Sequence, residues 1–184
     1  MEVVSLAIPD VKLITPRRIA DPRGFFAETF SLRHFAEAGL ISDFVQDNHS
    51  LSRPAGTVRG LHFQRPPFAQ AKLVRVLRGA IYDVALDIRR ASPTYGRHVA
   101  VEITAEGGTM ILVPEGFAHG FCTLSTDTEV FYKVNRDYAP QHEGGILWND
   151  PALGIAWPVD AAEAVLSDRD RKWPTFSEFT RAVA

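Results

Sequence analysis

Strand-length segments that recur at short intervals, separated by turns rich in Gly and Pro, most constrain the fold of this chain. KLVRVLRG and AIYDVALDIRR meet at Gly79, SPTYG precedes the alternating segment RHVAVEIT, and AEGG precedes TMILVP. Strand side chains alternate between two faces, so these segments predict strands that each bury one face. Many short strands with little helix predict an all-β fold, and we expect a cupin-like jelly-roll barrel.

The few helices that the sequence predicts are short and peripheral. Ser31 is placed to cap a helix in SLRHFAEAG, which Gly39 ends, and the tail from Ala161 has a modest helical pattern. The sequence DPRG at residues 21–24 is typical of a turn. No repeat or change of composition divides the chain, so we expect a single domain over residues 1–184.

Charge and cysteine content exclude several classes of function. The 20 Lys and Arg against 22 Asp and Glu give a net charge of −2, which argues against a general nucleic-acid binder. Cys122 is the single cysteine, so an internal disulfide and a multi-cysteine zinc site are excluded. We see no membrane-spanning stretch and no basic region before a long apolar run at the N-terminus. We therefore expect a cytoplasmic protein without a nucleic-acid or membrane partner.

Residues 56–72, GTVRGLHFQRPPFAQAK, concentrate polar side chains in what otherwise looks like buried strand. Strict alternation puts His62 and Gln64 on one face with Val58, and puts Arg59 on the other face. On this segment alone, His62 can be a structural histidine that is hydrogen-bonded within a barrel, or it can be a catalytic group.

Other predicted strands carry polar side chains on a single face. In FVQDNHSLS the amides of Gln46 and Asn48 share a face, and in KLVRVLRG the side chain of Lys72 shares a face with two valines. Tyr132 shares a valine-lined face in TEVFYKV, where it can also be a core tyrosine satisfied by a hydrogen bond. Inward amides predict a polar cavity, and the mouth of a barrel is where a ligand would bind.

A metal site and a metal-free acid/base site are the two chemical interpretations of these residues. His119 in PEGFAH fits the second motif of metal-binding cupins, but Gln64 and Lys72 stand where the first motif needs a histidine and a glutamate. An ammonium group has no free lone pair and repels a divalent cation, so we expect no metal. Without a metal, His62 can remove a proton next to a ketone, Lys72 can stabilise the enolate, and Tyr132 can return a proton from across the substrate.

Several motifs, in the same order, resemble those of the dTDP-4-dehydrorhamnose 3,5-epimerases. Between residues 3 and 170 they are DPRGFFAETF, QDNHS, GTVRGLHFQ, QAKLVRVLRGAIYDVALDIRRASPTYG, VPEGFAHGF, VFYKV and WNDPALGIAWP. The resemblance implies a cupin-like barrel, a homodimer, no metal or other cofactor, and a dTDP-4-keto-6-deoxyhexose substrate inverted at carbons 3 and 5. A one-carbon epimerase, a 3,4-ketoisomerase and a non-catalytic nucleotide-sugar-binding cupin are the alternatives, and Tyr132 favours the double epimerase.

The resemblance also implies roles for individual residues. His62 matches the general base, Tyr132 the acid and Lys72 the group near the keto oxygen. An acidic residue near the C-terminus pairs with the base in this family, and Asp170 fits that place, although Asp168 is close to it in sequence. The substrate-binding positions that the resemblance implies are Arg23, Glu28, Gln46, Asn48, Arg59, His119, Tyr138, Glu143 and Arg169.

Three of these positions belong to the nucleotide end of the substrate. Arg23 and Arg59 match contacts to the nucleotide or its diphosphate, and Tyr138 matches the aromatic that stacks on thymine. Family dimers place residues 23–28 near the site of the partner subunit. Because alternation puts Arg59 on the face opposite His62, Arg59 reaches the same ligand only through a bulge or from a strand end near the barrel mouth.

Overall fold

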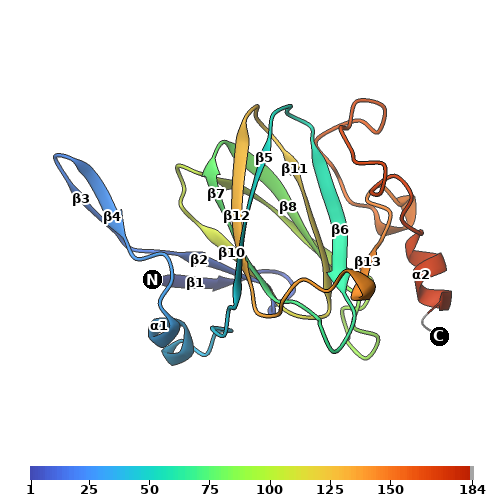
Figure 1. Ribbon diagram of the computed structural model, residues 1–184, viewed down its shortest axis with the longest axis horizontal. Helices are drawn as coiled ribbons and strands as arrows, with labels where there is room; N and C mark the ends of the chain where they lie inside the picture. The colour runs from blue at the N-terminus through green and yellow to red at the C-terminus, as the bar shows by residue number, and fades with distance from the viewer. Residues whose placement is uncertain (183–184) are drawn as a thin grey trace.

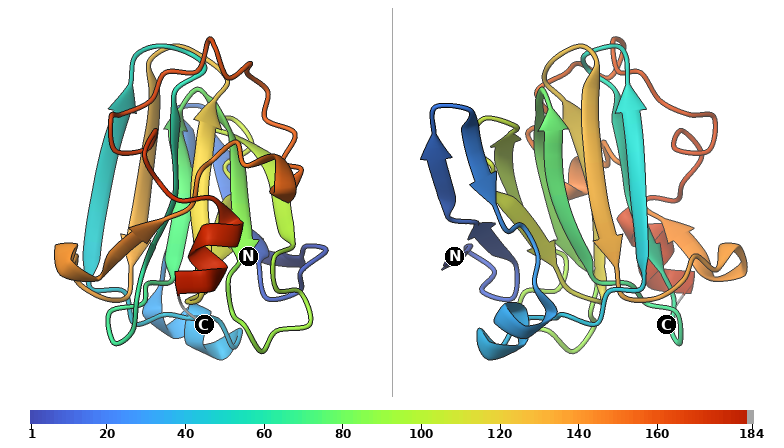
Figure 2. Two further views of the ribbon diagram at one scale, coloured as in Figure 1. Left: turned by 90° about the vertical axis from the view of Figure 1, so that its right-hand side faces the viewer. Right: turned by 60° about the vertical axis from the view of Figure 1, so that its left-hand side comes forward.

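Two antiparallel sheets face each other in the computed structural model, which describes residues 1–182 (Figures 1 and 2). In order across the sheet, the six-stranded sheet consists of β1 (Glu2–Ser5), β2 (Lys12–Thr15), β10 (Met110–Val113), β7 (Lys72–Arg78), β12 (Thr128–Val134) and β5 (Gln46–Ser52). The five-stranded sheet consists of β13 (Glu143–Gly145), β6 (Val58–Gln64), β11 (Phe117–Thr123), β8 (Ala80–Asp87) and β9 (His98–Thr104).

The space between the sheets is apolar on one side and polar on the other. Val76 of β7, Ile81 of β8 and Ile103 of β9 belong to one buried cluster that joins both sheets. Toward β5 and β6 the inward side chains become polar, beginning with Lys72 of β7. The apolar side holds the sheets together by excluding water, and the polar side leaves room for a ligand.

Short helices cover the outer faces of the sheets. Ser31 caps α1 (Leu32–Glu37), as predicted, and Phe35 of this helix packs into a cluster with residues of the six-stranded sheet. Phe179 of α2 (Phe176–Ala182) packs against Phe63 of β6, with ring centroids 5.4 Å apart. Two 3₁₀ turns, η1 (Pro140–His142) and η2 (Pro151–Leu153), lie in the connections that follow β12. The predicted cupin-like jelly-roll barrel with short peripheral helices is confirmed.

A bulge in β6 corrects the predicted faces of that strand. His62 lies opposite His119 of β11, and Arg59 lies opposite Phe121. Arg59 and His62 are therefore three positions apart on β6, whereas their partners are two positions apart on β11. The extra residue turns Arg59 to the face of His62, whereas Val58 packs in an outer cluster. Grouping Val58 with His62 was therefore wrong, and the bulge that Arg59 requires is present.

Gly60 makes this bulge possible. Its φ is +141°, and a Cβ added there would lie 2.5 Å from the Cα of Gly120 on β11. The backbones of β6 and β11 approach so closely at this point that no side chain fits between them. We expect no other residue to be accommodated at Gly60 without displacing Arg59 or His62.

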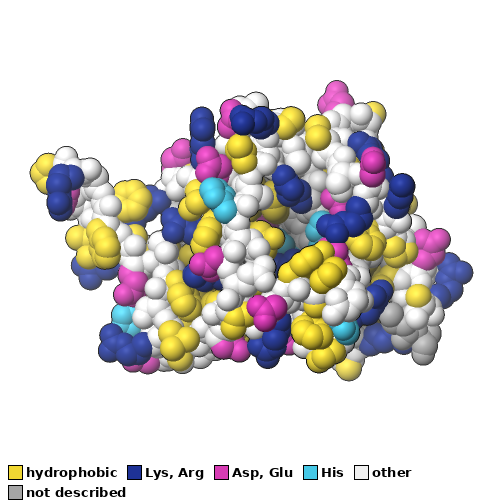
Figure 3. All heavy atoms as spheres, viewed as in Figure 1, with side chains coloured by type: hydrophobic (Ala, Val, Ile, Leu, Met, Phe, Trp, Pro, Cys, Tyr) yellow, Lys and Arg dark blue, Asp and Glu magenta, His cyan; other side chains and the backbone are white. Residues whose placement is uncertain are grey.

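The hairpin of β3 (Arg18–Asp21) and β4 (Gly24–Ala27) projects away from the barrel (Figure 1). The predicted turn lies at its tip, and Ile19, Phe25 and Phe26 expose 58%, 58% and 69% of their surfaces. The space-filling view shows hydrophobic and basic side chains together on this arm (Figure 3). Along the described part of the chain, no helix is both long and apolar enough to span a membrane.

Candidate active site

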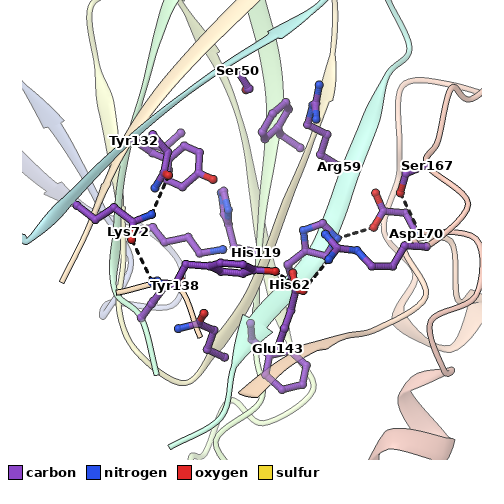
Figure 4. A pocket seen from close by; sticks show the side chains of 18 residues that line it. Ser50, Arg59, His62, Lys72, His119, Tyr132, Tyr138, Glu143, Ser167 and Asp170 are labelled. Carbon is purple, nitrogen blue, oxygen red and sulfur yellow. Dashed lines mark hydrogen bonds and ion pairs between the residues drawn. The ribbon is translucent and has the colours of Figure 1, made fainter. Parts of the chain in front are cut away.

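A cavity of about 410 Å³ lies between the two sheets (Figure 4). This volume is in the range of small-molecule sites. All predicted site residues except Arg23 and Glu28 line the cavity. They are Gln46, Asn48, Arg59, His62, Lys72, His119, Tyr132, Tyr138, Glu143, Arg169 and Asp170.

His62 and Asp170 form a hydrogen-bonded pair on one side of the cavity. His62 Nε2 lies 2.5 Å from Asp170 Oδ1, and the indole of Trp173 donates to the same oxygen at 3.2 Å. A carboxylate only accepts hydrogen bonds, so Nε2 carries a proton, and in the neutral ring Nδ1 keeps its lone pair. Burial would raise the pKa of Asp170, but the hydrogen bonds that it accepts from His62, from the Ser167 hydroxyl and from the Trp173 indole hold it below the usual value.

The neighbouring acid is placed differently. Asp168 is exposed and does not line the cavity, whereas Asp170 is 4% exposed. Within the charged run 168–172, the chain turns Asp170 inward toward β6. Of the two acids, Asp170 is the one that can hold the ring of His62 in one orientation.

Lys72 approaches the cavity from the opposite sheet. Burial lowers the pKa of Lys72 to about 8, and the negative charges of Asp83 and Glu143 oppose this fall. The Lys72 side chain lines the cavity beside Val74 of the same strand. A cation of this kind, without a charged partner among the described residues of the cavity, is suited to an oxygen that gains negative charge during a reaction.

Tyr132 lies on the same sheet as Lys72 and faces the sheet of His62. The register of β12 sets Tyr132 between Asn48 of β5 and Val74 of β7. Burial raises the pKa of Tyr132, the charge of Arg59 opposes this rise, and the charge of Glu143 adds to it. A phenol with a raised pKa keeps its proton at neutral pH, so Tyr132 can act as a proton donor.

Glu143 connects two segments at the rim of the cavity. Its Oε2 accepts hydrogen bonds from the Tyr138 hydroxyl at 3.0 Å and from Arg169 at 2.6 Å. The backbone amide of Tyr138 in turn donates to the side chain of Gln46 at 3.0 Å. Tyr138 is 53% exposed, so its ring offers a flat surface at the entrance.

Arg59 stands at another part of the rim. Its Nε donates to the Ser52 hydroxyl at 3.1 Å and its Nη2 donates to the Leu51 carbonyl at 3.2 Å. These bonds tie β6 to the end of β5. The guanidinium is oriented by neutral oxygens alone, so its charge stays available to an anionic ligand.

Arg23 and Glu28 are not brought to this cavity by their own chain. The side chain of Arg23 is 90% exposed at the tip of the β3–β4 hairpin, where it pairs with Asp21. Glu28 lies 2.6 Å from His34 Nδ1 of α1. Arg23 lies on the projecting hairpin and Glu28 directly follows it, and neither residue lines the cavity of its own chain.

The residues present do not fit a cupin-type metal. In the described part of the chain, no group of three or more His, Cys, Asp or Glu side chains could hold a metal ion. Gln64, at a position where such a site needs a histidine, uses its amide to bind three backbone groups. Its Nε2 donates to the carbonyls of Phe68 and Asp137, and its Oε1 accepts from the amide of Ala139.

Sequence reasoning missed Asp83 and did not foresee the structural role of Gln64. Gln64 holds the loop that carries Tyr138, and Asp83 on β8 contacts His119. For Asp83 a signal was present, because a carboxylate in the inward row of the apolar strand AIYDVALD needs a partner. The signal for Gln64 was weaker, because an amide can bind either a ligand or the backbone.

Comparisons with known proteins identify the family of this chain. The family model described as dTDP-4-dehydrorhamnose 3,5-epimerase matches residues 5–178. The chain is 51% identical over 174 residues to the dTDP-4-dehydrorhamnose 3,5-epimerase of Sinorhizobium fredii. The aligned region covers 95% of this chain and 89% of that relative.

Two solved structures show the same fold. The dTDP-4-dehydrorhamnose 3,5-epimerase of Bacillus anthracis, with TDP and PPi bound, superposes with a TM-score of 0.92 at 47% identity, over 95% of this chain and 99% of that one. The dTDP-6-deoxy-D-glucose-3,5-epimerase of Legionella pneumophila, in complex with dTDP-4-keto-L-rhamnose, gives 0.90 at 40% identity, over 96% of this chain and 93% of that one.

The barrel and its cavity define a cupin-like protein whose polar interior carries a histidine–carboxylate pair, a lysine and a tyrosine. These are the groups of an acid/base site. With the matches above, the chain belongs to the dTDP-4-dehydrorhamnose 3,5-epimerase family.

Proposed function

We propose that this protein inverts carbons 3 and 5 of dTDP-4-keto-6-deoxy-D-glucose to give dTDP-4-keto-L-rhamnose. The observation that carries the proposal is the division of the acid/base groups between two facing sheets. His62, paired with Asp170, comes from the five-stranded sheet, whereas Lys72 and Tyr132 come from the six-stranded sheet. Inversion of a carbon needs proton removal on one face and proton return on the other, and this arrangement supplies both.

Each group has one step in the proposed reaction. His62 removes the proton from the carbon next to the ketone and becomes an imidazolium, which Asp170 stabilises. The electron pair moves to the keto oxygen, where the Lys72 ammonium stabilises the enolate. Tyr132 then donates its proton to the opposite face of the carbon, and exchange with water restores both residues.

The nucleotide end of the substrate would bind at the rim of the cavity. The Arg59 guanidinium is suited to the diphosphate and the exposed ring of Tyr138 to stacking on thymine. No metal or other cofactor takes part in this mechanism. We also propose that residues 1–184 act as one domain and that the protein works in the cytoplasm.

The product of the reaction tests the proposal. Incubated with dTDP-4-keto-6-deoxy-D-glucose, the protein should give a sugar inverted at carbons 3 and 5, identified by NMR. Inversion at one carbon would instead show a one-carbon epimerase, and a 3-keto product would show a ketoisomerase. An unchanged substrate that still binds would show a nucleotide-sugar-binding protein without this activity.

Replacing Tyr132 by Phe should separate proton removal from proton return. We expect product formation to fall by about 10²–10⁴-fold, as for loss of a general acid, while exchange of substrate protons with solvent continues. Tyr95→Phe is the matched control, because the Tyr95 hydroxyl bonds Thr180 at 3.0 Å, away from the cavity. Equal loss of exchange and product formation in Tyr132→Phe would show that Tyr132 is not a separate acid.

We further propose that the protein is a homodimer in which the β3–β4 hairpin completes the site of the partner. The exposed Phe25 and Phe26 beside Arg23 favour this, because apolar side chains on a projecting arm gain stability when another surface covers them. Sedimentation should then show a dimer. In it, Arg23 and Glu28 of one chain would reach the cavity of the other.

Mixing two defective variants tests whether the site is shared. Arg23→Ala and His62→Ala should each have low activity at limiting substrate. If Arg23 acts on the partner's site, random exchange of subunits restores about one quarter of the sites, because each mixed dimer holds one intact site. Activity that does not rise on mixing, in a preparation shown to contain mixed dimers, would place Arg23 outside the partner's site.

A further inference from the structure

Trp173 contacts both members of the histidine–carboxylate pair, although it does not line the cavity. Its indole Nε1 donates to Asp170 Oδ1 at 3.2 Å, and His62 Nε2 bonds the same oxygen. The indole meets the His62 ring edge to face, with ring centroids 6.1 Å apart and an interplanar angle of 68°. The proposed reaction uses His62 and Asp170 and assigns no role to this indole.

Gly145 of β13 makes room for the indole. It lies opposite His62 in the β13–β6 ladder. A Cβ added at Gly145 would lie 2.6 Å from Cγ of Trp173 and closer still to Cδ2 and Cε2, so no side chain fits there while the indole keeps its place. The backbone of Gly145 is outside the left-handed region, so glycine is needed at this position for space and not for its conformation.

The chain around Trp173 is fixed to its surroundings. The carbonyl of Pro174 accepts from the amide of Leu147, just after β13, at 2.8 Å. The Arg169 guanidinium lies over the indole, 5.8 Å from the ring centroid, and also bonds Glu143 at the rim. The indole is therefore held on several sides, which is what a group that orients another side chain requires.

A carboxylate can turn about its last torsion angle and offer either oxygen to a histidine. Two donors on one oxygen of Asp170 favour the orientation in which Oδ1 faces His62. We propose that Trp173 is a positioning residue that holds Asp170, and through it the His62 ring, in the orientation for proton removal, and that Gly145 is required because it makes room for the indole. The consequence for catalysis rests on the proposed epimerase activity, whereas the orientation of the pair does not.

Trp173→Phe keeps an aromatic ring and removes the indole N–H. We expect kcat for epimerisation to fall by about 2–10-fold, the range for one hydrogen bond, while KM stays close to the wild-type value because Trp173 is outside the cavity. Trp157→Phe is the matched control, since Trp157 is also half-buried and its indole donates to the Trp148 carbonyl at 2.8 Å, outside the cavity. Its kcat should equal that of the wild type. A rise in KM without a fall in kcat in Trp173→Phe would overturn the positioning role.

Gly145→Ala tests the same contact from the side of β13. The added methyl group displaces the indole, so kcat should fall at least as far as in Trp173→Phe. In Trp173→Ala there is no indole to displace, so adding Gly145→Ala should cost little further activity. An equal loss from Gly145→Ala in both backgrounds would show that the methyl group acts through the β13–β6 ladder, and would overturn the role given to Gly145.

The indole ¹H–¹⁵N resonance of Trp173, assigned by its absence in Trp173→Phe, tests the contact without substrate. It should move in Asp170→Asn, which removes the charge of the acceptor, and stay in place in Asp168→Asn, whose side chain is exposed and outside the cavity. A resonance that does not move in Asp170→Asn overturns the proposal. A resonance that moves in a protein without epimerase activity would refute the epimerase mechanism and leave the positioning role intact.

A measurement on the wild-type protein covers the case in which these variants do not fold. Nuclear Overhauser contacts should join the ring protons of Trp173 to those of His62, because the two rings meet edge to face. Their absence would overturn the proposal.

Discussion

His62→Ala should lose turnover by about 10²–10⁴-fold, the range for removal of a general base. Proton exchange should be lost at both carbons together, because one base serves both inversions in the proposed mechanism. Its loss of proton exchange should exceed that of Tyr132→Phe, which leaves proton removal intact. Solvent exchange followed by NMR, with thermal unfolding as a check on the fold, measures this loss.

The partner of His62 supplies the control for this prediction. Asp170→Asn should also lower kcat, because an amide group can hold the ring in the wrong tautomer and does not stabilise the imidazolium. Asp168→Asn changes a neighbouring acid that is exposed and outside the cavity, so it should retain wild-type activity. Full turnover by His62→Ala would show that the base lies elsewhere.

Lys72→Met should lower kcat/KM by about 10²–10³-fold, as for loss of one group that stabilises an oxyanion. Methionine fills a similar space without the charge, so the change removes the enolate-stabilising cation and leaves the sheet intact. Lys12→Met is the control, because the Lys12 ammonium bonds Ser5 and Pro9 far from the cavity.

The same lysine predicts a pH dependence. Lys72 is charged below its pKa of about 8 and neutral above it. Since only the charged form stabilises the enolate, kcat/KM of the wild type should fall as the pH rises through about 8. A profile that stays level well above this pH would contradict the proposed role of Lys72.

The fold was largely predictable because each strand carries its own signal. The alternation of Gln46 and Asn48 in β5, and of Lys72 with valines in β7, gave the correct inward faces. Ser31 and Gly39 likewise mark the ends of α1 through local backbone chemistry. Such signals depend on neighbouring residues and need no knowledge of the tertiary structure.

The site was predictable only in part, because some of its contacts depend on distant segments. Asp170 reaches His62 across 108 positions of sequence, and no spacing rule connects them. The face of Arg59 depends on how β6 pairs with β11, where the close approach of Gly60 and Gly120 creates the bulge. The family resemblance supplied Asp170, whereas the bulge follows from the pairing of the two strands.

Deuterium incorporation from heavy water tests the central claim most directly. With dTDP-4-keto-6-deoxy-D-glucose in deuterated water, the protein should place deuterium at carbons 3 and 5, because each inverted carbon receives its new proton from a residue in exchange with solvent. Mass spectrometry and NMR of the product locate the label. Deuterium at both carbons is the predicted result, and deuterium at neither carbon would contradict the account.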